Sequence, residues 1–190
     1  MDREISEKEN FHKISFKDQT LKKKIFIKCH FSNCYFNELV FNETGFEDCV
    51  FKYCDFSLSK LNNCRFTDVS FQSSKLVGID WTKSSKIFLD VDFMECKLNH
   101  SIFSGLNLKK VKIENCEAKD CDFTDTDLSE SSLIGTDFSE SIFSNTNLNS
   151  ADLLHATNYH IDPNLNNIKK AKFTFPQVMG LLSYLDVEVE

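Results

Sequence analysis

The chain has 190 residues, a formal net charge of −7 and 41% hydrophobic residues, which are typical of a soluble protein with one substantial core. Its first segment, residues 1–10, is charged and has no apolar run, so it does not read as a secretory signal and we expect a flexible N-terminus. No later window approaches the ~18 apolar residues of a membrane span, so we expect a cytoplasmic protein.

From Phe11 the sequence repeats every five residues. Fifteen apolar centres fall at every fifth position from Phe11 to Trp81, and fourteen more from Phe88 to Leu153. A helix has a period of about 3.6 and a strand a period of 2, so neither produces this spacing. Such short units cannot bury their apolar sides alone, and the pattern therefore predicts stacked coils.

A second signal lies two residues before each centre, where the residue is small or modestly apolar. All eight cysteines occupy this position: Cys29, Cys34, Cys49, Cys54, Cys64, Cys96, Cys116 and Cys121. A free cysteine behaves as a small hydrophobe, and the spacing lacks the paired cysteines of structural zinc sites. We expect them to fill the core, with neither metal nor other cofactor.

The units "CDFTD", "TDLSE", "TDFSE", "TNLNS" and "ADLLH" carry a pattern that resembles the pentapeptide-repeat family. The resemblance covers about residues 11–155. It implies an all-β fold, a right-handed quadrilateral parallel β-helix with four units per coil and about seven coils. We expect this β-helix over residues 11–157, with an irregular first coil.

Between Trp81 and Phe88 the spacing is seven residues instead of five. We expect a two-residue insertion at residues 82–87 to bulge from one corner as a small surface loop, with Trp81 and Phe88 both facing the core. Either the loop is a tolerated insertion or it contacts a partner through Lys83, Ser84, Ser85 or Lys86.

The repeat ends after Leu153, and residues 158–190 read as a turn at "IDPN", a short helix and a strand. The apolar residues of this segment could cap the last coil or form a homodimer interface. The interface prediction names Val178, Leu181, Leu182, Leu185, Val187 and Val189.

Negative charge is concentrated late in the chain. Between Glu114 and Asp152 there are ten acidic residues against Lys119 alone, a local charge of −9. If a coil is twenty residues, Glu117 stacks on Asp137 and Asp120 on Glu140, which folding alone does not favour. The surface is either a solvated face or a binding site for a basic partner, and it argues against direct contact with nucleic acid. The candidate residues are Glu117, Asp120, Asp122, Asp125, Asp127, Glu130, Asp137 and Glu140.

The tail from Asn158 and the stretch "GIDWT" resemble the gyrase-protecting branch of the family, which includes quinolone-resistance and albicidin-resistance proteins. That resemblance implies a homodimeric DNA mimic that binds DNA gyrase or topoisomerase IV and acts in antibiotic resistance. A basic cluster from Lys22 to Lys28 lies at the opposite end and has no assigned role.

Two other functions stay open. The chain could be a scaffold for another, unknown protein partner, since fold alone does not fix function. It could also be an enzyme, but no nucleophile, histidine and acid are placed together and no glycine-rich phosphate loop is present. We therefore expect a binding protein without a small-molecule substrate.

Overall fold

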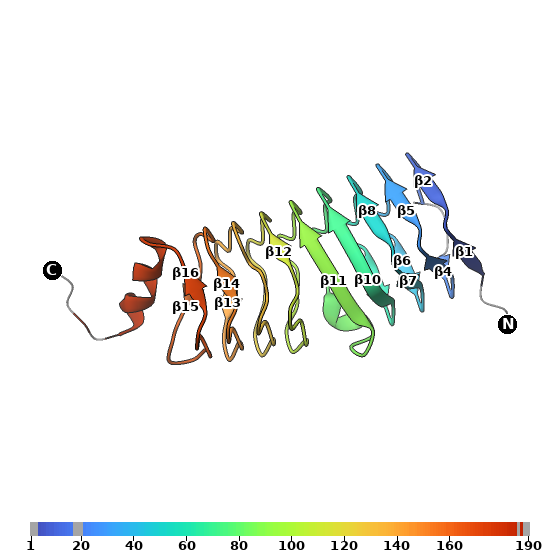
Figure 1. Ribbon diagram of the computed structural model, residues 1–190. Helices are drawn as coiled ribbons and strands as arrows, with labels where there is room; N and C mark the ends of the chain where they lie inside the picture. Colours follow the sequence, from blue (N-terminus) through green and yellow to red (C-terminus); the bar gives the residue numbers. More distant parts are fainter. Residues whose placement is uncertain (1–3, 17–20, 186, 188–190) are drawn as a thin grey trace.

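The computed structural model describes residues 4–16, 21–185 and 187. The chain winds into a parallel β-solenoid of about eight turns, with the N-terminal coils at one end of a rod and the C-terminal helix at the other (Figure 1). The predicted fold class is confirmed, with one turn more than the expected seven.

The paired strands are parallel and lie one coil apart along the chain. Phe31 pairs with Phe51 and Phe41 with Leu61, so a coil takes twenty residues as predicted. The largest sheet contains β1 (Ile5–Glu7), β4 (Ile25–Ile27), β7 (Gly45–Glu47), β10 (Arg65–Gln72), β8 (Val50–Lys52), β5 (His30–Ser32), β2 (Asn10–His12), β11 (Leu89–Met94) and β12 (Ile113–Glu114). The smaller sheets contain β3 (Leu21–Lys22), β6 (Val40–Asn42) and β9 (Lys60–Asn62); β13 (Ile142–Phe143) and β15 (His160–Ile161); and β14 (Asp152–Leu153) and β16 (Lys172–Phe173).

Most corners of the described coils hold a residue in the left-handed backbone region. Asp48, Asp120 and Asn145 are examples, with φ between 52° and 54°. Non-glycine residues adopt this conformation at a cost, which Asp and Asn tolerate best. The coil above compensates, because the corner N–H of Asp48 donates to the carbonyl of Thr67 at 3.0 Å. This repeated bond explains how the chain turns so often with so few glycines.

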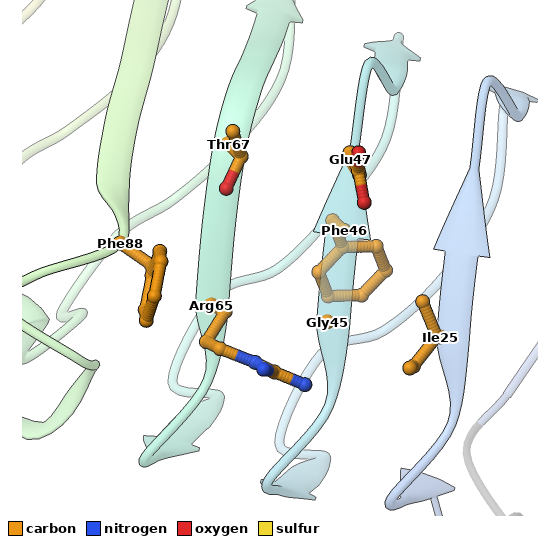
Figure 2. Close-up of a pocket in the computed structure, with 7 residues that line it drawn as sticks. All are labelled: Ile25, Gly45, Phe46, Glu47, Arg65, Thr67 and Phe88. Carbon is orange, nitrogen blue, oxygen red and sulfur yellow. The ribbon is translucent and has the colours of Figure 1, made fainter. Parts of the chain in front are cut away.

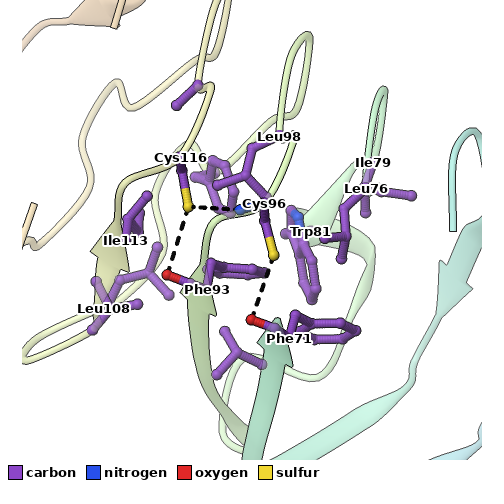
Figure 3. Close-up of a cluster of buried hydrophobic side chains, with 14 of the residues drawn as sticks. Phe71, Leu76, Ile79, Trp81, Phe93, Cys96, Leu98, Leu108, Ile113 and Cys116 are labelled. Atoms are coloured by element: carbon purple, nitrogen blue, oxygen red, sulfur yellow. Dashed lines mark hydrogen bonds between the residues drawn. The ribbon is translucent and has the colours of Figure 1, made fainter. Parts of the chain in front are cut away.

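The repeat centres and the small residues before them form one continuous core. Phe51 stacks between Phe31 and Phe71 at ring distances of 4.6 and 5.0 Å. All eight cysteines are buried and unpaired, which confirms their prediction as core residues. Seven of the sulfurs, all except that of Cys64, donate to backbone carbonyls of the preceding coil, as Figure 3 shows for Cys96 and Cys116. Burial raises the pKa of the Cys64 thiol to about 12, so it stays protonated at neutral pH.

The solenoid begins earlier than predicted. β1 pairs with β4 through Ile5 and Ile25, so the described residues before Phe11 belong to the first coil, where we expected a flexible segment. The expected irregularity of that coil is visible at Glu9, which is exposed in a position that faces inward in later coils.

The solenoid also continues past the predicted boundary at residue 157. β15 pairs with β13 and β16 pairs with β14, and Tyr159 and Ile161 are buried. The turn expected at "IDPN" is present, since Asn164 N–H donates to the carboxylate of Asp162 at 2.8 Å. The step from Phe143 to Ile161 is shorter than a full coil of twenty residues, and the residues of this turn restore the full length for the next pairs. The spacing of apolar residues in the sequence did not predict this change.

The insertion lies where the spacing indicated, but its outcome differs at Phe88. Trp81 is buried as predicted and begins a short 3-10 helix, η1 (Trp81–Lys83). Phe88 is 47% exposed, so its prediction as a core residue is wrong. Phe66 pairs instead with Leu89, and the pairing returns to register at Val69 and Val91 after a bulge. The loop therefore turns Phe88 out of the core.

A 3-10 helix, η2 (Gln177–Tyr184), closes the C-terminal end of the rod and packs against β15 (Figure 1). Leu181 is buried against the last coil and Val178 packs partly against it. The prediction of a helix followed by a strand is confirmed for the helix only, because the expected strand falls mostly outside the described residues.

Candidate protein-binding surfaces

The acidic residues of the second half surround the coils instead of forming one patch. The predicted stacking of Glu117 on Asp137 is confirmed by their parallel pairing. Their charges, however, are offset by cations of the preceding coil: Lys97 lies 3.0 Å from Glu117 and Lys119 lies 3.1 Å from Asp137. Each of these two stacked carboxylates therefore has a lysine beside it that offsets the repulsion between them.

Glu130 is paired in the same way. Its two carboxylate oxygens lie 2.8 Å from Lys109 Nζ and 3.6 Å from Lys110 Nζ. The hydrogen bond from Lys109 lowers the pKa of Glu130 from its ordinary value. Counting charges along the sequence missed these pairs, because the partners lie about twenty residues away. A count that steps by one coil would have found them.

Asp137 is the most strongly held carboxylate of the set. Partial burial raises its pKa, but hydrogen bonds from Ser139, Asn158 and Lys119 outweigh that effect and hold the pKa well below its usual range. Asn158 Nδ2 lies 2.9 Å from Oδ1, and Ser139 Oγ lies 2.6 Å from the same oxygen. The Asp137 carboxylate already accepts these bonds within the fold, so few of its acceptor sites are left for a binding partner.

Most of the predicted acidic residues that have no Lys or Arg neighbour lie on one side of the rod. Asp122 lies in the ladder between Ile102 and Ile142, and the corner residues Asp120 and Asp125 flank it on either side. Glu140 occupies the corner one coil beyond Asp120. We call Asp120, Asp122, Asp125 and Glu140 the acidic strip.

Within the described residues, no lysine or arginine nitrogen lies within 4.0 Å of a carboxylate of the acidic strip. Its nearest cationic candidate is His100, whose Nδ1 lies 3.6 Å from Asp120. Asp127, on the next face, also has no such cation, but accepts hydrogen bonds from Ser129 N–H and Asn147 Nδ2. The strip is therefore the part of the predicted surface with the most uncompensated charge.

The C-terminal end is strongly apolar on its outer side. Of the predicted interface residues, Leu181 is buried and Val178 and Leu182 are half-buried, whereas Leu185 and Val187 are 40% and 53% exposed. Val189 lies outside the described residues. Three further apolar side chains that the sequence pattern did not indicate are exposed near this end, Phe175, Met179 and Tyr184. The segment thus caps the last coil and leaves an apolar surface uncovered.

The four loop candidates have different surroundings. Ser84 is buried and donates to the carbonyl of Trp81, so it supports the loop and is not open to a partner. Lys83 is exposed and lies 3.6 Å from Asp80. Ser85 is half-buried, and Lys86 is exposed. The most exposed apolar residue of the loop is Ile87, which is 85% exposed and was not among the predicted contacts.

The basic cluster at the N-terminal end is largely neutralised. Lys23 and Lys28 lie 3.8 and 4.0 Å from Glu43 and Asp48 of the next coil, and Lys24 lies 3.0 Å from Glu4. These are exposed pairs that contribute little energy. The cluster is a solvated, charge-balanced face.

Two further observations concern the described part of the chain only. It contains no group of three His, Cys, Asp or Glu residues arranged to hold a metal ion. None of its helices has the length and apolar character needed to cross a bilayer.

Comparisons with known proteins agree on the repeat. The family model described as "Pentapeptide repeat region" matches residues 24–86, and the model "Pentapeptide repeats (8 copies)" matches residues 121–156. A search of curated proteins finds no significant match. Two solved structures of trypsin-treated variants of QnrB1, a plasmid-mediated fluoroquinolone resistance protein, are similar in fold. One is 18% identical, covers 100% of both chains and has a TM-score of 0.65; the other is 21% identical, covers 100% of this chain and 94% of its own, and has a TM-score of 0.55.

Proposed function

Because the chain belongs to the pentapeptide-repeat family, we propose that it binds a type II topoisomerase such as DNA gyrase or topoisomerase IV and protects it from a poison of the quinolone or albicidin kind. In this proposal the protein is a cytoplasmic binding protein and not an enzyme. The observation that carries the proposal is the acidic strip next to an uncovered apolar end of the rod. The fold of QnrB1, described as a fluoroquinolone resistance protein, is consistent with it.

The apolar end supports a dimer of rods. Leu185, Val187 and Phe175 are 40%, 53% and 76% exposed, and burying such side chains contributes about 25 cal/mol per Å² of apolar surface. Two copies joined through this end would form one longer rod. Its middle would carry the two acidic strips, and its two tips would carry the balanced N-terminal coils.

Folding does not require a charged group at Asp122. Asp122 accepts a hydrogen bond from the N–H of Thr124 at 2.9 Å, which stabilises the turn. Asn107 and Asn147 accept the equivalent bond in other coils, so a neutral amide serves equally well. The acid in place of the amide thus adds charge without adding a turn contact. A rod of this kind presents regularly spaced negative charge, as duplex DNA does, to a basic protein surface.

Supercoiling by purified gyrase, titrated with this protein in the presence and absence of a quinolone and of albicidin, tests the proposal. We expect inhibition at high concentration or rescue from at least one drug. No effect across a wide titration contradicts the proposal. A pull-down that recovers another protein and no topoisomerase would then favour the scaffold function.

Charge variants make the test specific to the acidic strip. The triple variant Asp120→Asn, Asp122→Asn, Glu140→Gln removes three charges and keeps the hydrogen-bond acceptors. The control Glu38→Gln, Asp48→Asn, Asp68→Asn removes the same number of charges from the first half. We expect association about tenfold slower for the first variant and nearly unchanged for the second. Equal effects would contradict a role for the strip.

A further inference from the structure

The two-residue insertion places a core-sized aromatic ring on the surface. Phe88 is 47% exposed and Leu89, which pairs with Phe66, is only half-buried. Full burial of a phenylalanine side chain stabilises a fold by about 1.5–3 kcal/mol, and an exposed ring loses much of that contribution. Folding therefore gives no reason for this arrangement.

Phe88 forms one wall of a hollow on the outer face of the first coils. The hollow has a volume of about 370 Å³ and is lined by Ile25, Gly45, Phe46, Glu47, Arg65, Thr67 and Phe88 (Figure 2). Gly45 lies between Ile25 and Arg65 in the ladder of β4, β7 and β10, and its missing side chain opens the notch. A smaller hollow of about 200 Å³ lies on the other side, where Arg65 and Phe88 again line the wall.

Arg65 gives this notch a positive charge. Its guanidinium reaches over Gly45, with Nη2 3.8 Å from the position a Cβ would occupy there. Among the described residues no carboxylate lies within 4.0 Å of it, whereas Lys23, Lys24 and Lys28 on the same coils all have acidic neighbours. Glu47 lies toward the other end of the hollow (Figure 2). A guanidinium on an apolar floor is suited to a carboxylate, which it can bind through two parallel hydrogen bonds.

We propose that this hollow binds a protein segment of the partner in which a carboxylate side chain lies next to an apolar one. The carboxylate binds Arg65, and the apolar side chain fills the notch over Gly45 between Ile25 and Phe88. Glu47 repels a second acid and thereby sets the orientation of the segment. The inference rests on the proposed function for the identity of the partner, a type II topoisomerase, and adds a second contact of opposite charge to the acidic strip.

One substitution fills the notch from a backbone position that accepts a side chain. Gly45 does not have a left-handed backbone, and a Cβ there meets its neighbours at an ordinary 3.8 Å. Gly45→Leu therefore plugs the hollow at no backbone cost. The matched control is Ser70→Leu, which adds the same side chain at an outward position of β10 on another face. Arg65→Gln removes the charge alone.

Two probes separate this inference from the proposed function. With purified gyrase, we expect at least tenfold weaker binding for Gly45→Leu and for Arg65→Gln, and unchanged binding for Ser70→Leu. With anilinonaphthalene sulfonate, a fluorescent dye that joins an anionic group to apolar rings, we expect lower fluorescence for Gly45→Leu than for Ser70→Leu. Dye bound at the C-terminal apolar end is common to both variants and cancels in that comparison.

Each outcome decides one of the two proposals. If the wild type binds gyrase and Gly45→Leu binds as well as Ser70→Leu, the binding hollow is overturned and the topoisomerase partner stands. If the wild type binds no gyrase, the topoisomerase partner is overturned. In that case a difference in dye fluorescence between the two leucine variants still supports an acidic and apolar occupant, and equal fluorescence overturns it.

Discussion

The coils before Trp81 and the coils after Val91 use the same five-residue unit but fill it differently. In the first region stacked phenylalanine rings make up most of the core, as at Phe31 and Phe51, and the sides of the coil are mostly strands of two or three residues. In the second region leucines such as Leu128 and Leu133 replace many of the rings, and the coils are joined mostly by single bridges between tight turns.

Charge follows the same division. Residues 1–81 hold twelve acidic and twelve basic side chains, and the excess of acid lies beyond them. In the second region Asp122, Asp127 and Asp137 each accept a backbone N–H two residues later, so aspartate there also shapes the turn. One solenoid thus combines an aromatic core in its first half with a charged surface in its second half.

The largest expected effect tests the aromatic half of this comparison. Phe51 and Leu133 are both fully buried centres on the same side of the coil. We expect Phe51→Ala to lower the free energy of unfolding by about 3–5 kcal/mol, because it removes a ring that stacks between two others and meets three more edge-on. Leu133→Ala should cost about 2–3 kcal/mol. Urea denaturation of both variants measures the difference, and an equal or larger loss for Leu133→Ala would contradict the division.

In the C-terminal helix, the residue that caps the last coil differs from the residue available for self-association. Leu181 is 7% exposed and Leu185 is 40% exposed. We expect Leu181→Ala to lower the free energy of unfolding by about 2 kcal/mol, since it opens the last coil. Leu185→Ser should leave folding nearly unchanged and should weaken self-association in sedimentation equilibrium. A wild type that is monomeric at high concentration would remove the dimer from the proposed function.

Much of the fold follows from the apolar period alone, because every centre contacts the residues one coil away. The register of twenty residues and the burial of the cysteines were predictable for that reason. The position of Phe88 was not, since a sequence shows that two residues are added but not which side chain leaves the core. The ion pairs of Glu117 and Glu130 were missed because charge was counted along the chain, although the partners are contributed by the previous coil.

A smaller effect concerns Asp137 and acid. Its pKa is lowered in the folded state, so the stability it contributes is present above the unfolded pKa of about 3.9 and is lost as the pH falls below that value toward the folded pKa. We expect Asp137→Asn to lose about 1–2 kcal/mol of unfolding free energy at pH 7 and to depend less on pH below 4. Asp48→Asn is the control, since its exposed pair with Lys28 at 4.0 Å is worth about 1 kcal/mol or less. Parallel pH profiles for the wild type and Asp137→Asn would contradict this account.

The smallest expected effect lies at the junction of the two regions. Ser84 is buried at the position one coil beyond Cys64, and Val91 is buried in register with Val69, so Lys86 and Ile87 are the added pair. If both residues are deleted, Phe88 follows Phe66 by one coil of twenty residues and takes the inward position. Ser85 then takes the outward position above Arg65. We expect the variant to fold, to gain about 1 kcal/mol of stability, and to bury the ring.

The same deletion removes a wall of the hollow beside Arg65, so binding there should fall although stability does not. Gyrase binding and the denaturation midpoint measure the two effects, and hydrogen exchange at residues 84–93 reports whether the ring is buried. A variant that becomes less stable would show that the loop itself supports the coil. A variant that is more stable and no longer binds would show that the insertion weakens core packing and creates an interaction surface.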